Sequence, residues 1–290
     1  MTDDPFVTHR SLLFTVAYEM LGSVADAEDV VQESWLRWAG VDQAEVRDSR
    51  AYLVRITTRQ ALDRLRTLGR RKESYFGPWL PEPLLTAPDV AEDVELADSL
   101  SMAMLLVLET LGPTERAVFV LREVFDLGYD EIAEAVDKTP AAVRQIAHRA
   151  RTHVAARRPR DLVSPAETRA ALEAFQRAIE TGDLQSLIDI LAPDVVALGD
   201  GGGVKQAMPR PVMGADKVAR LFAVGFKMVR DKVSVEPAQV NGCPALIIRL
   251  NGEIDSVVAV RIDDGLVTGL YTVRNPEKLS HITQETAVTR

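Results

Sequence analysis

The strongest constraint on the fold of this chain lies in residues 129–158, whose pattern predicts two helices joined by a tight turn. Ile132, Ala133 and Val136 give the first helix one apolar face, and residues 137–138 predict the turn. Thr139 then supplies an N-cap oxygen, and Pro140 takes the first helical position, where its missing N–H costs nothing. The second helix has an apolar face at helical spacing, formed by Val143, Ile146, Ala147 and Ala150. This is the pattern of a helix-turn-helix.

The opposite face of the second helix is polar and basic. It carries Arg144, Gln145, His148, Arg149, Arg151 and Thr152. Residues 138–160 hold seven Lys/Arg and no Asp/Glu, although the whole chain has a formal net charge of −9. Such a concentration of like charge indicates a surface that binds a phosphate backbone. The alternative is a solvated helix that happens to be basic.

The charge is segregated elsewhere as well. Residues 50–72 carry eight Lys/Arg and one Asp, whereas residues 82–98 hold six acidic residues and no basic one. Two cationic segments separated by an acidic connector indicate a bipartite binding protein.

Size and composition bound the class of protein. With 290 residues and 47% hydrophobic content, the chain suits two or three small globular units. Its one cysteine, Cys243, excludes a disulfide framework or a cysteine-rich zinc site and fits a reducing cytoplasm. The acidic N-terminus does not resemble a signal peptide, and no run of about 18 apolar residues predicts a membrane span. We expect a cytoplasmic protein without a metal or cofactor.

Residues 6–72 predict an all-helical unit. A first helix ends at Gly22, a second begins with acidic residues at 26–29, a loop follows at 40–48, and residues 49–68 form a third helix. The second helix has an acidic outer face, and the third has a basic one. This contrast suggests two different partners, a protein and a nucleic acid. Ordinary solvated faces of a helical bundle explain this segment equally well.

Several blocks of the chain resemble a known family. The segments Asp26-Ala-Glu-Asp-Val-Val-Gln-Glu33, Ala51-Tyr-Leu-Val-Arg-Ile56 and Ala61-Leu-Asp-Arg-Leu-Arg66 resemble region 2 of bacterial extracytoplasmic-function (ECF) sigma factors. The segment from Leu111 to Glu123, followed by Tyr129-Asp-Glu-Ile-Ala133 and the basic helix, resembles region 4 of that family. The resemblance covers nearly all of residues 6–158.

The resemblance implies roles for the charged faces. The acidic helix would dock on core RNA polymerase at the clamp coiled coil, through Asp26, Glu28, Asp29, Gln32 and Glu33. The third helix would hold the melted minus-ten strand, with Arg55, Arg59 and Arg64 along its phosphates, and the loop at 40–48 would form a pocket for an extruded base. Region 4 would bind the polymerase flap and the minus-thirty-five element, with DNA contacts from Thr139, Arg144, Gln145, His148, Arg149 and Arg151. Which of these contact bases and which contact phosphates stays open.

The connector, residues 73–98, begins with an unusual block. Residues 75–83 contain three prolines and three aromatics, which favour an extended backbone and disfavour a helix. A flexible tether would be rich in Gly and Ser, and solvent exposure would not call for Trp79. We therefore expect this block to be pinned in an aromatic-accepting groove; a plain stiff spacer is the alternative. The acidic residues 82–98 suggest, from charge alone, a nucleic-acid mimic in the polymerase channel.

Residues 164–290 predict a different architecture. Helical spacing marks three helices, near residues 172–179, 184–191 and 218–226, and residues 194–198 alternate like a strand. Four further strands are predicted at 233–240, 245–250, 256–262 and 266–273, with a hairpin turn at Asp264-Gly265. Helices followed by a curved antiparallel sheet indicate an α+β cone, which resembles the SnoaL-like polyketide-cyclase fold. The predicted fold is thus multi-domain: residues 1–72 (region 2), 73–98 (linker), 99–160 (region 4) and 164–290 (cone).

Two motifs in the cone match a subgroup of ECF sigma factors that carry a fused SnoaL-like domain. They are Asp200-Gly-Gly-Gly203 with Lys205, and Asn275-Pro-Glu-Lys-Leu279. Val204 before the lysine and Glu277 in place of an aspartate depart from the subgroup pattern, and the first leaves the role of Lys205 open. In that subgroup the fused domain regulates the sigma modules in place of a separate anti-sigma protein. The implied regulatory residues are Tyr75, Gly77, Pro78, Trp79, Leu80, Pro81, Asp200, Gly201, Gly202, Gly203, Lys205, Asn275, Pro276, Lys278 and Leu279.

Two other classes of function need weighing. Cones of this kind enclose an apolar pocket, so a small-molecule ligand or a cyclase- or isomerase-like activity is conceivable, but an enzyme needs convergent acid and base groups. The one histidine of the cone, His281, follows the last strand, and we interpret Asp194, Asp200, Glu253 and Asp255 as solvated. The second alternative is an operator-binding helix-turn-helix regulator with a ligand-sensing domain. Such a protein would need neither the acidic helix nor a second basic segment.

Overall fold

The N-terminal part of the chain is a bundle of three long helices. We describe a computed structural model that covers residues 4–73, 75–87, 90, 93–157 and 165–290. Helix α1 (Pro5–Leu21) ends at Gly22, which adopts a left-handed φ of 66°, and Ser23 caps α2 (Val24–Ala39). A short 3₁₀ turn (Gln43–Glu45) leads to α3 (Ser49–Glu73), which continues five residues past its predicted end. The predicted C-terminal cap at Gly22 and the order of the helices are confirmed, whereas α2 begins two residues before its predicted start.

The second helical part contains the helix-turn-helix. Helices α4 (Val94–Leu100), α5 (Met102–Leu108) and α6 (Pro113–Phe119) precede a π-helical segment, Val120–Val124. Helix α7 (Tyr129–Val136) ends at Asp137 with a φ of 54°, and Thr139 accepts a hydrogen bond from the Ala142 N–H (3.2 Å) at the start of α8 (Pro140–Ala155). The predicted turn and cap are confirmed, and the four predicted core residues of α8 are buried.

The connector is extended only in its first part. Helix α4 begins inside the connector, beyond the block at 75–83 predicted to be non-helical. Asp93 accepts a hydrogen bond from the Leu96 N–H (3.1 Å) and so acts as its N-cap. Residues 75–87 run without regular structure between the helical body and the sheet domain, apart from one bridge between Leu85 and Val240. Ser74, Asp89, Glu92, Arg158 and Arg160, which belong to the predicted connector and basic segment, lie outside the described residues.

The C-terminal domain is an α+β cone with a six-stranded sheet. Its elements are α9 (Pro165–Thr181), α10 (Leu184–Ile190), β1 (Leu191–Asp200), β2 (Val212–Met213), α11 (Ala215–Val229), β3 (Val233–Val240), β4 (Cys243–Leu250), β5 (Glu253–Asp263) and β6 (Leu266–Val273). The strand order is β2-β1-β6-β5-β4-β3. The predicted all-antiparallel sheet that follows the helices is wrong in one respect. Strand β1 precedes α11 and pairs parallel with β6, because α11 carries the chain across before the β3–β6 meander returns beside β1. The predicted hairpin turn is confirmed: Asp264 and Gly265 both have positive φ.

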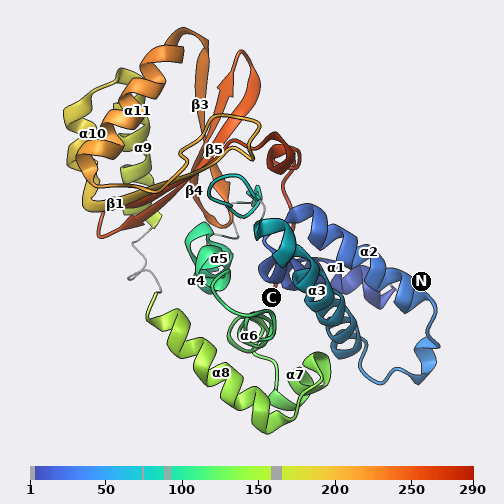
Figure 1. Ribbon diagram of the computed structural model, residues 1–290. Coiled ribbons are helices and arrows are strands. Elements are labelled where there is room, and N and C mark those ends of the chain that lie inside the picture. Colours follow the sequence, from blue (N-terminus) through green and yellow to red (C-terminus); the bar gives the residue numbers. More distant parts are fainter. Residues whose placement is uncertain (1–3, 74, 88–89, 91–92, 158–164) are drawn as a thin grey trace.

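The two faces of the sheet have different neighbours (Figure 1). Helices α9, α10 and α11 cover one face, where Phe175 and Phe222 pack edge to face at 5.7 Å. The other face packs against the linker and α5, with Leu80, Met102 and Tyr271 in one apolar cluster. The sheet is therefore also an interface between the cone and the helical body. None of the helices in the described part of the chain is long and apolar enough to span a bilayer.

Candidate functional site

Asp200, the last residue of β1, is the centre of a buried polar cluster that joins the cone to the linker. Its carboxylate accepts hydrogen bonds from the Tyr75 hydroxyl (2.6 Å) and from the Leu80 N–H (2.9 Å) on the linker. It also accepts bonds from the Gly202 N–H (3.0 Å) and the Lys278 ammonium (2.8 Å) within the cone. The interpretation of Asp200 as solvated is wrong. Four donors compensate for its complete burial.

Lys278 is the cationic partner in this cluster. Its side chain is 7% exposed and donates to the Leu80 carbonyl oxygen as well as to Asp200. The ammonium lies 4.1 Å from the centroid of the Trp79 ring and 4.9 Å from that of Tyr75, within cation–π range of both. Burial lowers the pKa of Lys278, and the neighbouring Asp200 carboxylate opposes that shift. The linker is thus held through both its backbone and its aromatic rings.

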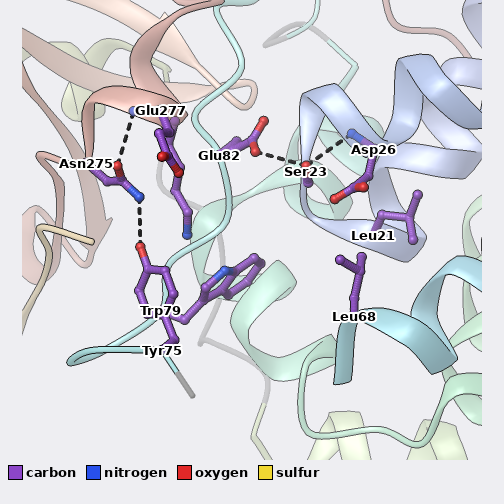
Figure 2. Close-up of a pocket in the computed structure, with 10 residues that line it drawn as sticks. Leu21, Ser23, Asp26, Leu68, Tyr75, Trp79, Glu82, Asn275 and Glu277 are labelled. Carbon is purple, nitrogen blue, oxygen red and sulfur yellow. Dashed lines mark hydrogen bonds between the residues drawn. The ribbon is translucent and has the colours of Figure 1, made fainter. Parts of the chain in front are cut away.

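The two cone motifs meet at the Tyr75 hydroxyl, which contacts Asp200 of the first motif and Asn275 of the second; Figure 2 shows the contact with Asn275. The Asn275 side-chain amide donates to the Tyr75 hydroxyl (2.9 Å), while its carbonyl oxygen accepts from the Glu277 N–H and caps the 3₁₀ turn Pro276–Leu279. Gly202 has a φ of 63°, and a Cβ there would lie 2.4 Å from Asn275 Nδ2. The glycine loop therefore provides both a tight turn and a close approach.

The remaining residues of the implied regulatory set are spread around this cluster. Leu279 is buried against the sheet, and Pro81 is buried beside Gly22. Gly77 has a φ of 82°. Gly201 is also buried, whereas Pro78 is half-buried and Gly203 and Pro276 are exposed.

Lys205 lies outside the cluster. Its ammonium pairs with Asp255 (3.1 Å), which also receives the Arg274 guanidinium. The interpretation of Asp255 as solvated is therefore wrong as well, because two cations neutralise it. These hydrogen bonds lower the pKa of Asp255 against the opposing effect of burial, the largest single influence. Val204 is 70% exposed, so the inserted residue points away from the cone.

A second contact joins the linker to region 2 through Glu82. The buried Glu82 carboxylate accepts from the Ser23 hydroxyl (2.9 Å) and from the backbone N–H groups of Val24 (2.6 Å) and Ala25 (3.3 Å) at the start of α2. A carboxylate is favoured at a helix N-terminus, where unpaired N–H groups converge. In this conformation Glu82 is therefore not available to act as a nucleic-acid mimic. The Glu82 carboxylate is instead hydrogen-bonded within the protein, at the start of α2.

A third contact, not predicted from the sequence, is the turn between β3 and β4. Asn241 is fully buried and donates to the Tyr18 hydroxyl (2.6 Å) and the Leu100 carbonyl (3.1 Å), while its side-chain oxygen accepts from the Leu84 N–H (3.0 Å). A Cβ at Gly242 would lie 2.7 Å from the Cα of Ala97. Asn-Gly between two strands signals a hairpin turn, but nothing local indicates that the turn plugs into α1, the linker and α4.

A cavity of about 270 Å³ opens where region 2, the linker and the cone meet. Figure 2 shows the side chains that line it. They are Leu21, Ser23, Asp26, Leu68, Tyr75, Trp79, Glu82, Asn275, Glu277 and Lys278.

The basic face of α3 is covered by the helix-turn-helix. The Arg55 guanidinium pairs with the Glu134 carboxylate of α7 (2.9 Å), and Arg59 donates to the Glu134 carbonyl oxygen (2.7 Å). Arg64 instead pairs with Asp26 (2.7 Å) and Asp29 on α2. In this conformation Arg59 remains exposed, as expected for an outward-facing arginine, whereas Arg55 and Arg64 are half-buried. Two of them face α7, and the third joins the acidic helix.

The other predicted contact residues are more accessible. On α2, Gln32 and Glu33 are exposed, and Glu28 pairs with Arg10 (2.6 Å). On α8, Arg144, Gln145, His148 and Arg149 are exposed. Arg151 lies 3.4 Å from the Glu123 carboxylate, and the Arg144 guanidinium lies 5.6 Å from the Tyr129 ring centroid. The outer face of α8 is thus available to a ligand in this conformation.

Two helical modules, one of them a helix-turn-helix, joined by a linker to an α+β cone define the class of this protein. Residues 6–71 match the model of Sigma-70 region 2, and residues 101–154 match that of Sigma-70 region 4. The chain therefore has the two DNA- and polymerase-binding modules of a sigma factor.

Known relatives extend this assignment to the whole chain. The ECF sigma factor SigJ of Mycobacterium tuberculosis is 36% identical over 95% of this chain and 92% of its own length, and probable SigI of the same species is 32% identical over 96% and 94%. The crystal structure of SigJ superposes with a TM-score of 0.77, covering 95% of this chain and 97% of that one. This chain belongs to the ECF sigma factors. It is an alternative sigma factor that binds core RNA polymerase and promoter DNA and directs transcription initiation.

Proposed function

We propose that the SnoaL-like cone regulates this sigma factor by gripping the linker and holding regions 2 and 4 in a closed arrangement. The observation that carries the proposal is the Asp200 cluster. There one carboxylate binds the linker at Tyr75 and Leu80 and is itself held by Lys278. The Glu82 and Asn241 contacts support the same role, because they tie the linker and the cone directly to region 2.

The spacing of promoter elements supports the need for an open form. The minus-ten and minus-thirty-five elements are separated by about 25 base pairs, or roughly 85 Å of duplex at about 3.4 Å per base pair. In the closed form Arg59 of α3 touches α7, and one surface hollow is lined by Arg55 and Arg59 together with Lys138 and Pro140 at the start of α8. Both elements cannot be bound at once from this arrangement, so initiation requires α3 and the helix-turn-helix to separate.

We propose the following division of roles. Residues 1–72 and 99–160 act as regions 2 and 4, residues 73–98 as the linker and residues 164–290 as the regulatory domain. The acidic face of α2 docks on the polymerase clamp, with Asp29 and Glu33 central, and region 4 docks on the flap. After opening, Arg55, Arg59 and Arg64 contact the melted minus-ten strand, and the outer face of α8 contacts the minus-thirty-five element.

The cone has no catalytic role in this proposal, and the fused domain replaces a separate anti-sigma protein. Phe175 and Phe222 fill the space between the helices and the sheet, where a substrate would bind in an open cone. The Asp255 carboxylate is neutralised by Lys205 and Arg274 and is not available as a base. A regulatory ligand would act more directly from the junction cavity than from the cone interior, because region 2, the linker and the cone all border the cavity.

In vitro transcription tests the proposal. The full-length protein is compared with an Asp200→Asn variant and with a truncation after residue 165, all with core polymerase and one promoter. Variants that weaken the grip of the cone should change transcript yield while still binding core polymerase. Equal yields from all three proteins, at equal polymerase occupancy, would remove the cone from the mechanism. A truncated protein that neither folds nor binds polymerase would contradict the division into modules.

A further inference from the structure

The last residues of the chain return from the cone to region 2. After the 3₁₀ turn Pro276–Leu279, Ile282 packs on the sheet face, and the chain then crosses the linker, where the Thr286 N–H donates to the Leu85 carbonyl oxygen (2.9 Å). The C-terminus lies beside α1, on the helical body and not on the cone (Figure 1). The segment therefore touches the cone, the linker and region 2 in turn.

Residues 288–290 are fixed to the helical body by three kinds of contact. Val288 is 6% exposed and belongs to the apolar core of the helical modules. The Thr289 N–H donates to the hydroxyl of the buried Thr15 in α1 (3.1 Å), and the Arg290 guanidinium pairs with Asp93 (3.0 Å) and Glu95 around the start of α4. An apolar anchor, a backbone hydrogen bond and a charge pair give this docking position a defined register.

We propose that residues 286–290, the C-terminal strap, form an intramolecular clasp that holds region 2 against the linker and the cone and must detach before the sigma factor opens. This inference rests on the proposed closed form but concerns a different contact from the Asp200 cluster. The contact site, made by the linker, α1 and the start of α4, accepts a segment with an apolar side chain at Val288 and a basic one at Arg290. The tether to Lys278 keeps that segment at a high effective concentration.

The position of the strap explains how it acts. Lys278 holds the linker at Leu80, and Thr286 holds it again at Leu85, so one short stretch of the cone grips the linker at two points. Val288 then continues into region 2. Release of the strap removes its own contacts with α1 without disturbing the polar groups around Asp200, while the Asn241–Tyr18 contact between the cone and α1 remains. The strap and the Asp200 cluster should therefore contribute separately to the closed form.

The test places Val288→Asp beside a matched control, Ala287→Asp, which adds the same charge at an exposed neighbouring position. The fraction of open molecules is measured by energy transfer between dyes on α2 and α8 in the full-length protein. Burial of one valine side chain corresponds to about a ten- to hundredfold population shift. We therefore expect Val288→Asp, and a variant lacking residues 286–290, to raise the open-to-closed ratio by about that factor. The control should leave the ratio within about twofold.

Two further arms separate this inference from the proposed function. Arg290→Glu should raise the open fraction a few-fold, and the added change Glu95→Arg, at the other partner of Arg290, should restore it, which general misfolding would not do. Asp200→Asn is measured in parallel. If Asp200→Asn opens the protein but the Val288 and strap-deletion variants do not, the strap inference is overturned and the proposed function stands. If the strap variants open it and Asp200→Asn does not, the strap inference stands and the role of the Asp200 cluster fails.

Discussion

The pairing of Asp200 with Lys278 yields the sharpest quantitative prediction. Asp200→Asn keeps the shape of the side chain but leaves the Lys278 ammonium, which is 7% exposed, without a counter-charge. Loss of one partner from a buried ion pair costs about 3–5 kcal/mol. Lys278→Met should cost less, because the Asp200 carboxylate keeps three donors: the Tyr75 hydroxyl and the N–H groups of Leu80 and Gly202. At about 1.4 kcal/mol per factor of ten, the Asp200→Asn loss corresponds to a population shift of more than a hundredfold.

A double-mutant cycle measures this pairing. Urea unfolding of the wild type, both single variants and the Asp200→Asn/Lys278→Met double variant gives a coupling energy, for which we expect at least about 1.5 kcal/mol. The double variant should be more stable than Asp200→Asn alone, since no unpaired buried charge remains. The Lys205–Asp255 pair, which is more exposed, serves as the control and should couple by less than about 1 kcal/mol. Additivity of the Asp200 and Lys278 changes to within about 0.5 kcal/mol would refute the argument that this pair organises the junction.

Three further predictions concern the linker, the bundle and the DNA-contacting helix. Trp79→Ala should raise the open fraction and alter transcript yield, because the Trp79 ring contacts Lys278 and packs on Gly22, while circular dichroism should show that the modules remain folded. Trp79→Phe should largely retain the wild-type ratio of open to closed molecules. Equal behaviour of the two variants would argue against the ring contact. Burial raises the pKa of Glu19 to about 8, so the folded state holds one proton more than the unfolded state between about pH 5 and 8. Stability should fall across that window by up to about 1.4 kcal/mol per pH unit, and Glu19→Gln should flatten the slope in denaturation curves; an unchanged slope would place the proton elsewhere. Arg144→Ala should cost about 1–3 kcal/mol of promoter affinity and relax specificity at one position of the minus-thirty-five element, whereas uniform weakening across mutated promoters would mark it as a phosphate contact.

The elements that follow from local rules were predictable from the sequence. Thr139, Pro140 and the spacing of the apolar residues identify the start and the buried face of α8. Asp264 and Gly265 both adopt the positive φ that their residue types favour in a hairpin turn. Each of these features satisfies its hydrogen bonds locally, so a short window of sequence contains the relevant partners. The family resemblance added the modules, and it identified the residues that meet at Asp200.

The structural features that could not be predicted from the sequence involve residues whose contact partners lie far away in the chain. Asp200 appeared solvated because three of its four donors, Tyr75, Leu80 and Lys278, lie 78 or more residues away. The burial of Asn241 has the same origin, since it depends on Tyr18, 223 positions distant. Charge counts indicated basic surfaces correctly but did not reveal that α7 covers part of one of them. When the hydrogen-bond partners of a buried polar side chain lie far away in the chain, no local sequence pattern reveals its burial.

The central claim is that the free sigma factor is closed and that its two DNA-contacting modules separate when it engages polymerase and promoter. The most direct test is the distance between spin labels on Asp63 of α3 and Ala141 at the start of α8, in a Cys243→Ala background. Both positions are exposed, and each lies within about one helical turn of a residue that lines the hollow between α3 and the helix-turn-helix. The account predicts one short-distance population for the free protein and an increase of tens of ångströms with core polymerase and promoter DNA, as promoter elements roughly 85 Å apart require. Identical distance distributions in the free and the promoter-bound states would contradict it.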